Sequence, residues 1–146
     1  MRTKQGTAAE IDMDTAARLR LVVMRLARRL RQQAEFDASP TMLSAMATIE
    51  RGPLTLGGLA EAERVQPPTM TRVVARLEEV GLITRVPDPQ DKRVARVSLS
   101  ADGKRMLARN RSRKTAYLAK RLRATNVAEA DLAKAVELLE TILNED

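Results

Sequence analysis

Two short helices, a turn and a hairpin are predicted by residues 53–99, which read PLTLGGLAEAERVQPPTMTRVVARLEEVGLITRVPDPQDKRVARVSL. Apolar spacing predicts helices over about 56–63 and 66–80. Alternating residues then predict strands over 82–86 and 94–99, separated by a turn rich in Pro and Asp. This order is typical of a winged helix-turn-helix, which places one helix in a DNA groove and a loop beside it.

Composition excludes several kinds of chemistry. The 146 residues contain no Cys and no His, so thiol chemistry, imidazole bases and the commonest metal ligand are absent. Asp, Glu, Ser, Lys and Tyr remain, but no carboxylate pair, nucleophile motif or phosphate-cradling loop is present. We therefore expect no enzyme, no cofactor and no metal site.

No apolar run approaches the length of a membrane helix and no secretory signal is visible, so we expect a cytoplasmic protein.

The net charge of +7 favours a polyanionic partner, although an Arg- and Ala-heavy composition also fits a coding bias. Residues 1–51 carry nine basic and six acidic side chains, residues 52–100 carry seven and six, and residues 101–146 carry ten and seven. The predicted DNA-reading segment is thus nearly neutral. Any contact with DNA must depend on where its Arg side chains point.

The second helix of the motif has two different sides. On a 100° wheel, one arc is apolar and is expected to pack inward; its members are Met70, Val73, Val74 and Leu77. The opposite arc holds Pro68, Arg72, Ala75 and Glu79, flanked by Thr69, Thr71 and Arg76. Short side chains near the start and an Arg able to fork onto a guanine suit a major groove. The alternative is an ordinary amphipathic helix with a solvated Arg/Glu side.

The hairpin tip carries Asp91, Lys92 and Arg93. An Arg at a narrow tip can enter a minor groove, and an Asp two residues away can hold it extended. Arg85 and Arg96 on the stem are placed to touch phosphates, or simply to keep the hairpin soluble. A solvent-exposed turn with a weak ion pair is the plainer interpretation of the tip.

These segments strongly resemble the MarR family of bacterial transcription regulators. The resemblance is carried by residues 54–60 and 67–85, by Asp91-Lys92-Arg93, and by Val97-Ser98-Leu99-Ser100, and it extends over nearly the whole chain. It implies a homodimer on a pseudo-palindromic operator, usually repressing and released by a small, often aromatic and acidic, ligand. Pro68 and Arg72 match the family's base-reading positions, while Arg93 matches its wing arginine and Asp91 the bracing Asp. Two departures are Gly57-Gly58, which is expected to loosen the supporting helix, and the absence of Cys, which rules out thiol-based sensing.

The predicted fold is mainly α, with the flanking helices forming an intertwined dimerisation domain around the winged helix-turn-helix. We expect a mobile tail at 1–10, a dimerisation helix and a linking helix at 11–51, the DNA-binding domain at 52–100 and dimerisation helices at 101–146. Apolar residues on the last helix need a partner surface; they are Leu132, Val136, Leu139, Ile142 and Leu143. A monomer with a self-contained bundle is the alternative.

Ten residues are predicted to contact DNA: Thr55, Pro68, Thr69, Thr71, Arg72, Arg76, Asp91, Lys92, Arg93 and Arg96. The basic run from Lys104 to Arg123 fits a solvated face, or a surface that attracts phosphates or an acidic effector. Tyr117 and Phe36 are candidates to line an effector pocket, although core packing explains both rings equally well. A winged helix used only for protein interactions, without specific DNA binding, is the competing function.

Overall fold

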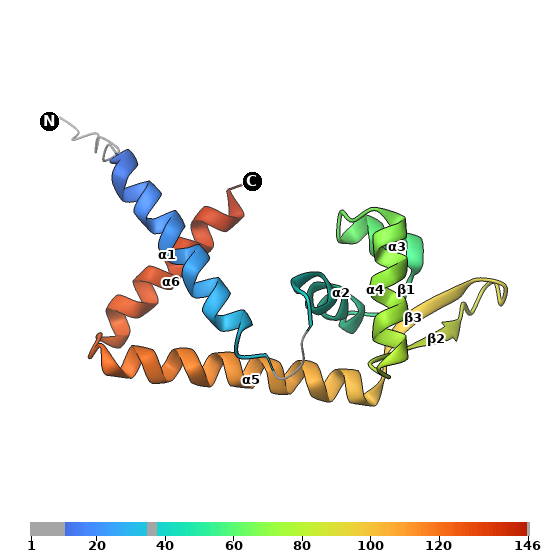
Figure 1. Cartoon of the computed structure of the whole chain (residues 1–146). Helices are drawn as coiled ribbons and strands as arrows, with labels where there is room; N and C mark the ends of the chain where they lie inside the picture. The colour runs from blue at the N-terminus through green and yellow to red at the C-terminus, as the bar shows by residue number, and fades with distance from the viewer. Residues whose placement is uncertain (1–10, 35–37, 146) are drawn as a thin grey trace, which may run out of the picture.

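The computed structural model describes residues 11–34 and 38–145, and it confirms a mainly helical winged-helix chain. The predicted tail at 1–10 lies outside the described residues. The elements follow in the order α1 (Met13–Arg31), α2 (Pro40–Glu50), β1 (Leu54–Thr55), α3 (Leu56–Ala62), α4 (Pro67–Glu79), β2 (Ile83–Pro87), β3 (Ala95–Leu99), α5 (Ala101–Ala124) and α6 (Glu129–Asn144). In Figure 1 the long helix α5 joins two groups, with α1 and α6 at one end and the other elements at the opposite end.

Side-chain caps fix where the helices begin, as the sequence predicts. Ser39 accepts a hydrogen bond from the backbone N–H of Met42, and Pro40 occupies the first helical position of α2. Ser100 accepts from the N–H of Gly103 at the start of α5. At the end of α4, Gly81 takes a φ of +76°, a conformation that an L side chain rarely adopts.

The sheet is larger than the predicted hairpin. Its strand order is β1-β3-β2 and both pairings are antiparallel. Leu54 pairs with Val97 and Thr55 with Arg96, so the two residues just before the first helix of the motif form a third strand. A two-residue strand leaves no readable alternation, and only its pairing with β3 reveals it.

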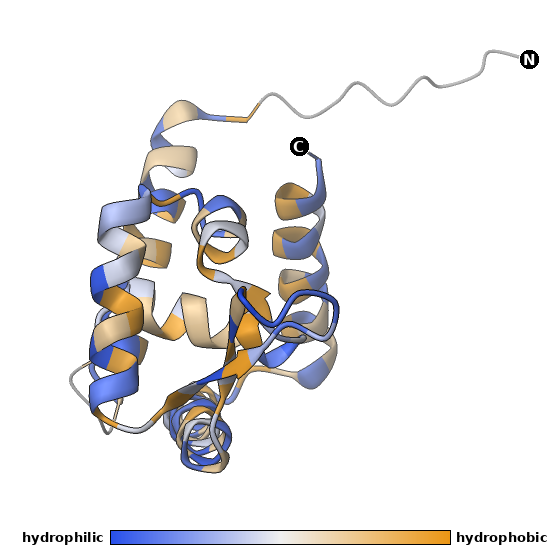
Figure 2. Cartoon of the chain, turned by 90° about the vertical axis from the view of Figure 1, so that its right-hand side faces the viewer, coloured by the Kyte–Doolittle hydropathy of each residue, from blue (hydrophilic) through white to orange (hydrophobic). Residues whose placement is uncertain are grey.

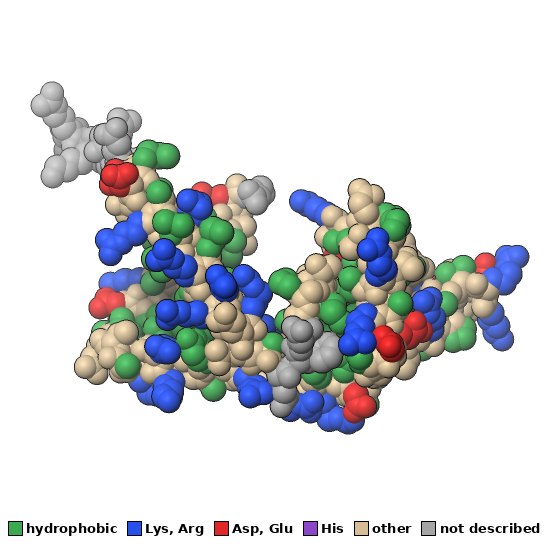
Figure 3. All heavy atoms as spheres, in the orientation of Figure 1, with side chains coloured by type: hydrophobic (Ala, Val, Ile, Leu, Met, Phe, Trp, Pro, Cys, Tyr) green, Lys and Arg blue, Asp and Glu red, His purple; other side chains and the backbone are tan. Residues whose placement is uncertain are grey.

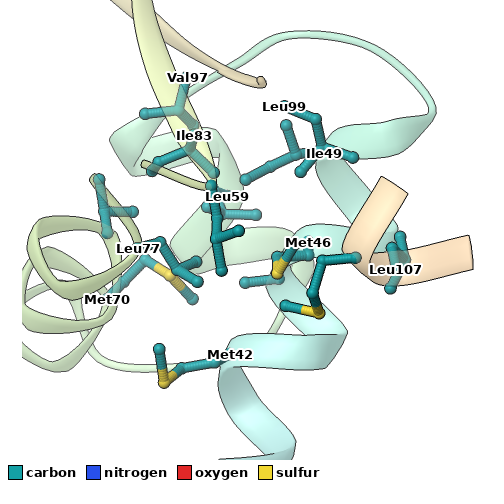
Figure 4. Packing of buried hydrophobic residues seen from close by; sticks show 14 of the residues in the cluster. Met42, Met46, Ile49, Leu59, Met70, Leu77, Ile83, Val97, Leu99 and Leu107 are labelled. Carbon is teal, nitrogen blue, oxygen red and sulfur yellow. The ribbon is translucent and has the colours of Figure 1, made fainter. Parts of the chain in front are cut away.

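The core fills the space between α2, α3, α4 and the sheet. Met46, Leu59, Met70, Leu77 and Ile83 are at most 2% exposed, and Figure 4 shows their side chains converging from these elements. Met106 and Leu107 bring the first half of α5 into the same cluster. The inward arc predicted for α4 is confirmed, with Val73 at its edge as a half-buried member.

By contrast, α1 and α6 contribute no buried residue in the single chain. Both carry exposed large apolar side chains, among them Leu19 and Val23 on α1 and Leu139 and Ile142 on α6. Figure 2 shows orange, hydrophobic residues recurring along α6 up to the end marked C. These helices are placed by α5, not by packing into the core.

Candidate nucleic-acid interface

The turn before α4 sets the direction of that helix. Arg64 adopts a φ of +52°, a left-handed conformation that ends α3 and turns the chain toward Pro67. Because Met70, Val74 and Leu77 point into the core, the opposite side of α4 faces solvent. The predicted outward residues of α4 are accordingly exposed; they are Pro68, Thr69, Thr71, Arg72, Ala75, Arg76 and Glu79.

The two Arg side chains on this side are in different states. Arg76 pairs with Glu79, with 2.9 Å between Nη1 and Oε2, and both side chains are more than half exposed. Such surface pairs are worth less than about 1 kcal/mol, so Arg76 can exchange its partner at little cost. Within residues 11–34 and 38–145, no hydrogen bond or ion pair engages the side chain of Arg72. Its guanidinium therefore keeps all five N–H donors for an external acceptor.

The Thr hydroxyls near the start of α4 also differ. Thr71 donates its hydroxyl hydrogen to the Pro67 carbonyl at 2.9 Å, which leaves only its acceptor lone pairs. In the part of the chain that the structure describes, Thr69 makes no side-chain hydrogen bond. Of the two, Thr69 is the better placed to donate to a phosphate.

We call the β2–β3 hairpin the wing. At its tip, the predicted contact between Asp91 and Arg93 is confirmed. Arg93 donates from Nε to Oδ1 at 3.1 Å and from Nη2 to Oδ2 at 3.2 Å, a two-pronged pairing. The Arg93 side chain is nevertheless 91% exposed. Hydrogen bonds from the Arg93 side chain and backbone hold the pKa of Asp91 below its usual range. The carboxylate thus stays ionised and keeps Arg93 extended into solvent, next to exposed Lys92.

Sequence reasoning missed the residue that anchors the base of the wing. Asp88 is 7% exposed, accepts backbone N–H bonds from Gln90 and Asp91 at Oδ1, and accepts from Arg96 Nε at Oδ2. The Arg96 bond, followed by the two backbone bonds, lowers the pKa of Asp88. An Asp between two prolines is a recognisable signal for such a turn, but its Arg partner lies eight residues away.

Arg96 therefore acts as a brace in the free protein. Besides Asp88, its Nη1 reaches the Pro53 carbonyl at 3.4 Å, so Arg96 links the wing to the segment before β1. The contact with DNA predicted for Arg96 stays a prediction. Because the bonds to Asp88 and Pro53 brace the wing, such a contact would have to form while Arg96 keeps them. On the other edge of the wing, Arg85 pairs with Glu78 of α4 at 2.9 Å.

Comparisons with known proteins identify this arrangement. The MarR family model matches residues 39–95, which run from the start of α2 to the start of β3. An uncharacterised HTH-type transcriptional regulator of Mycobacterium bovis is 39% identical over 92% of this chain and 96% of its own length. This chain belongs to the MarR family.

Solved structures extend the MarR match to the whole fold. A Pseudomonas aeruginosa PA01 protein assigned as a transcriptional regulator is 34% identical, with a TM-score of 0.79 over 99% of this chain and all of that one. A MarR family protein of Bacillus stearothermophilus is 25% identical, with a TM-score of 0.78 over 93% and 98% of the two chains. The chain is thus a DNA-binding transcription regulator of the MarR type.

The predictions for Thr55, for metal binding and for membrane helices concern the rest of this MarR chain. Thr55 is half-buried and its Oγ1 accepts the Gly58 N–H at 3.0 Å, so this hydroxyl caps α3 and its contact with DNA stays a prediction. Among the described residues, no group of three or more acidic side chains could hold a metal ion. None of the described helices is both long and apolar enough to cross a membrane.

Proposed function

We propose that this MarR regulator binds a pseudo-palindromic duplex as a homodimer and reads it with α4 in the major groove and the wing tip in the minor groove. The observation that supports this most directly is the availability of Arg72 on the exposed side of α4. Arg93, held extended by Asp91, projects from the same domain. Figure 1 shows α4 and the wing side by side at one end of the molecule.

We propose that the second copy packs against α1 and α6. An apolar groove of about 410 Å³ runs between the two helices, lined mainly by Leu19, Val23 and Met24 on one side and by Leu139 and Ile142 on the other. Burying these side chains in a partner would contribute roughly 25 cal/mol per Å² of apolar area to the free energy of dimerisation.

The proposed dimerisation region comprises α1, α6 and the second half of α5. The proposed reading domain takes in α2 as well as residues 52–100, because α2 packs into the winged-helix core.

We propose further that the dimer represses transcription and is released by a small acidic ligand. Tyr117 is half-buried, with the Arg121 guanidinium carbon 5.2 Å from the centre of its ring, while Phe36 lies outside the described residues. On the same helix Asn110 is 2% exposed, and its Oδ1 receives no hydrogen bond from the described part of the chain. A buried acceptor of this kind favours an acidic ligand that also carries a hydrogen-bond donor, such as the hydroxyl group of a hydroxybenzoic acid.

Ligand release is tested by adding a series of benzoic acids to the complex of the protein with the promoter duplex upstream of its own gene. At least one acid is expected to lower the bound fraction in a gel shift.

Repression is tested in cells, where deleting the gene should raise transcription from that promoter. A fall in transcription would make the protein an activator instead.

The reading roles predict different effects for two Arg variants on the same promoter duplex. Arg72→Ala is expected to weaken binding by about 1–3 kcal/mol and to relax base preference, because a forked contact to a guanine is lost. Arg93→Ala is expected to weaken binding with little change in preference and to reduce the salt slope by about 1. Titrations at two salt concentrations, with a set of single-base variants of the duplex, measure both quantities.

Arg31→Ala is the matched control, since Arg31 is an exposed Arg at the end of α1, outside the reading domain. It should change neither base preference nor affinity by more than about twofold. If Arg72→Ala behaved like Arg31→Ala, α4 would not read bases. Wild-type protein with no affinity for duplex DNA at low salt would instead support the protein-interaction module.

A further inference from the structure

Positive charge is concentrated on two helices that lie outside the proposed reading surface. α1 contains six Arg and one acidic residue, and α5 contains nine basic residues and one acidic residue. The rest of the chain has eleven basic and seventeen acidic residues. A coding bias toward Arg would be spread along the chain, so this uneven distribution needs a structural explanation.

On α5 the charge forms a continuous stripe. At 100° per residue, five exposed side chains fall within an arc of about 80°. They are Arg105, Arg109, Arg113, Lys120 and Arg123, which we call the α5 basic stripe. From its first to its last member the stripe is about 27 Å long, at 1.5 Å per residue. The one carboxylate in this arc, Asp102, pairs with Arg105 at the surface.

The stripe lies on a side of α5 that contributes no buried side chain, although Arg109 and Arg113 also interact within the protein. Met106, Leu107 and Asn110 are buried and fall outside the arc. The half-buried Leu118 and Leu122 lie on the far side of the helix from the stripe, so the apolar packing in the second half of α5 is also outside the arc. Covering several cations with an apolar partner surface is strongly unfavourable, so the stripe is expected to face solvent in a dimer as well. Figure 3 shows Lys and Arg side chains following the edge of the molecule along which α5 runs.

We propose that the α5 basic stripe binds the phosphate backbone of a second stretch of duplex DNA, distinct from the stretch read by α4. A duplex carries one negative charge per about 1.7 Å of its axis, so a stripe of about 27 Å can lie along about 8 base pairs. The large side chains within the arc are all charged, and the one other α5 residue that falls in it, Ala116, is small. This favours a charged backbone over a membrane, whose binding needs large apolar side chains on the same helix.

The inference rests on the proposed function, which assigns the exposed side of α4 and the wing to the first duplex. α5 runs along the edge of the molecule, and no residue of its basic stripe belongs to the core that α4 covers. One protein can then hold two DNA segments at once. Such binding draws on backbone charge alone, so it should be independent of base sequence.

The first test separates the stripe from the reading surface. In an Arg72→Ala, Arg93→Ala background, binding of a fluorescent 30-base-pair duplex of random sequence is measured by anisotropy across a salt series. Adding Arg105→Gln, Lys120→Gln and Arg123→Gln is expected to weaken binding at least tenfold and to reduce the salt slope by about 2.7, or 0.9 for each lost contact. Arg109 and Arg113 are left unchanged because both also interact within the protein. Arg105 pairs with Asp102, but both side chains are more than half exposed, so its loss should have little effect on folding.

The matched control in the same background is Arg18→Gln, Arg25→Gln and Arg31→Gln, three exposed positions on α1 that remove the same charge and do not line the apolar groove. It is expected to change affinity by less than threefold. Equal losses for the two triple variants, or no loss for the stripe variant, would overturn the proposal. Circular dichroism melts check that each variant is folded.

The second test asks for two duplexes on one protein. Wild-type protein is loaded on an immobilised random 30-base-pair duplex, and capture of a free fluorescent duplex is measured. For this test the two triple variants are made with Arg72 and Arg93 intact. Wild-type protein and the α1 variant should capture the free duplex, whereas the stripe variant should load normally and capture at least tenfold less. Loading without capture by wild-type protein would overturn the inference and leave the proposed function intact. If wild-type protein did not load, the result would count against both the proposed function and the α5 basic stripe. Comparing Arg72→Ala with wild type on the promoter duplex would then show whether the reading surface has failed.

Discussion

Gly103→Ala is expected to destabilise the protein by about 3 kcal/mol or more, which lowers Tm by about 10 °C. A Cβ at this position would lie 2.0 Å from the Leu82 carbonyl oxygen and 3.0 Å from its carbon, far inside van der Waals contact. The first turn of α5 is fixed to this backbone, because Ser100 N–H donates to the Leu82 carbonyl at 3.1 Å and Ser100 Oγ donates to the Gly81 carbonyl at 2.6 Å. Neither side can move away without breaking these bonds.

The same substitution at Gly57 is the control, and it has the opposite expected sign. Gly57 lies in α3, and beyond its own helical turn no described atom comes within 4 Å of the point where a Cβ would lie. Gly57→Ala should therefore raise stability by up to about 1 kcal/mol through helix propensity. Thermal melts of the two variants are compared at one protein concentration. Equal Tm values for Gly103→Ala and wild type would show that α5 does not approach Leu82 this closely.

Most of the winged helix could be predicted because its signals are local. The Ser39-Pro40 start of α2, the Ser100 cap and the apolar arc of α4 each depend on residues within one or two helical turns. The close approach of Gly103 to Leu82 could not be predicted, since it brings together residues 21 positions apart through the position of a whole helix. Glu63 is similar, as it accepts hydrogen bonds from Ser44 and Thr48 on a different helix.

In the candidate site, too, the features set by local sequence could be predicted and those set by distant contacts could not. Helical periodicity predicts which side of α4 faces outward, and the spacing of Asp91 and Arg93 predicts their pairing. Periodicity does not show which outward Arg is already paired, and only the structure distinguishes Arg76 from Arg72. It also cannot show that Arg96 is bound to a nearly buried Asp88, because that pairing depends on how the turn folds back on the strand.

Leu139→Asp is expected to convert the proposed dimer into monomers. Leu139 lines the apolar groove between α6 and α1, together with Leu19 and Val23. In a symmetric dimer the new carboxylate is present twice, and burying each one without a partner costs about 2 kcal/mol or more. The dissociation constant of the dimer should therefore rise about a thousandfold or more, by 1.4 kcal/mol for each factor of ten. Sedimentation velocity over a range of protein concentrations measures the change.

DNA binding should fall with the dimer, because a monomer presents one α4 and one wing to a site with two halves. The promoter duplex is expected to bind Leu139→Asp at least a hundredfold more weakly than wild type. Ala133→Asp is the matched control: Ala133 is an exposed residue of the same helix, and it lies on the side away from Leu139. It adds the same charge and should leave both the dimer and its affinity for DNA unchanged. A Leu139→Asp protein that stays dimeric would place the interface elsewhere, and a folded monomer that binds the duplex at wild-type strength would exclude reading by two copies.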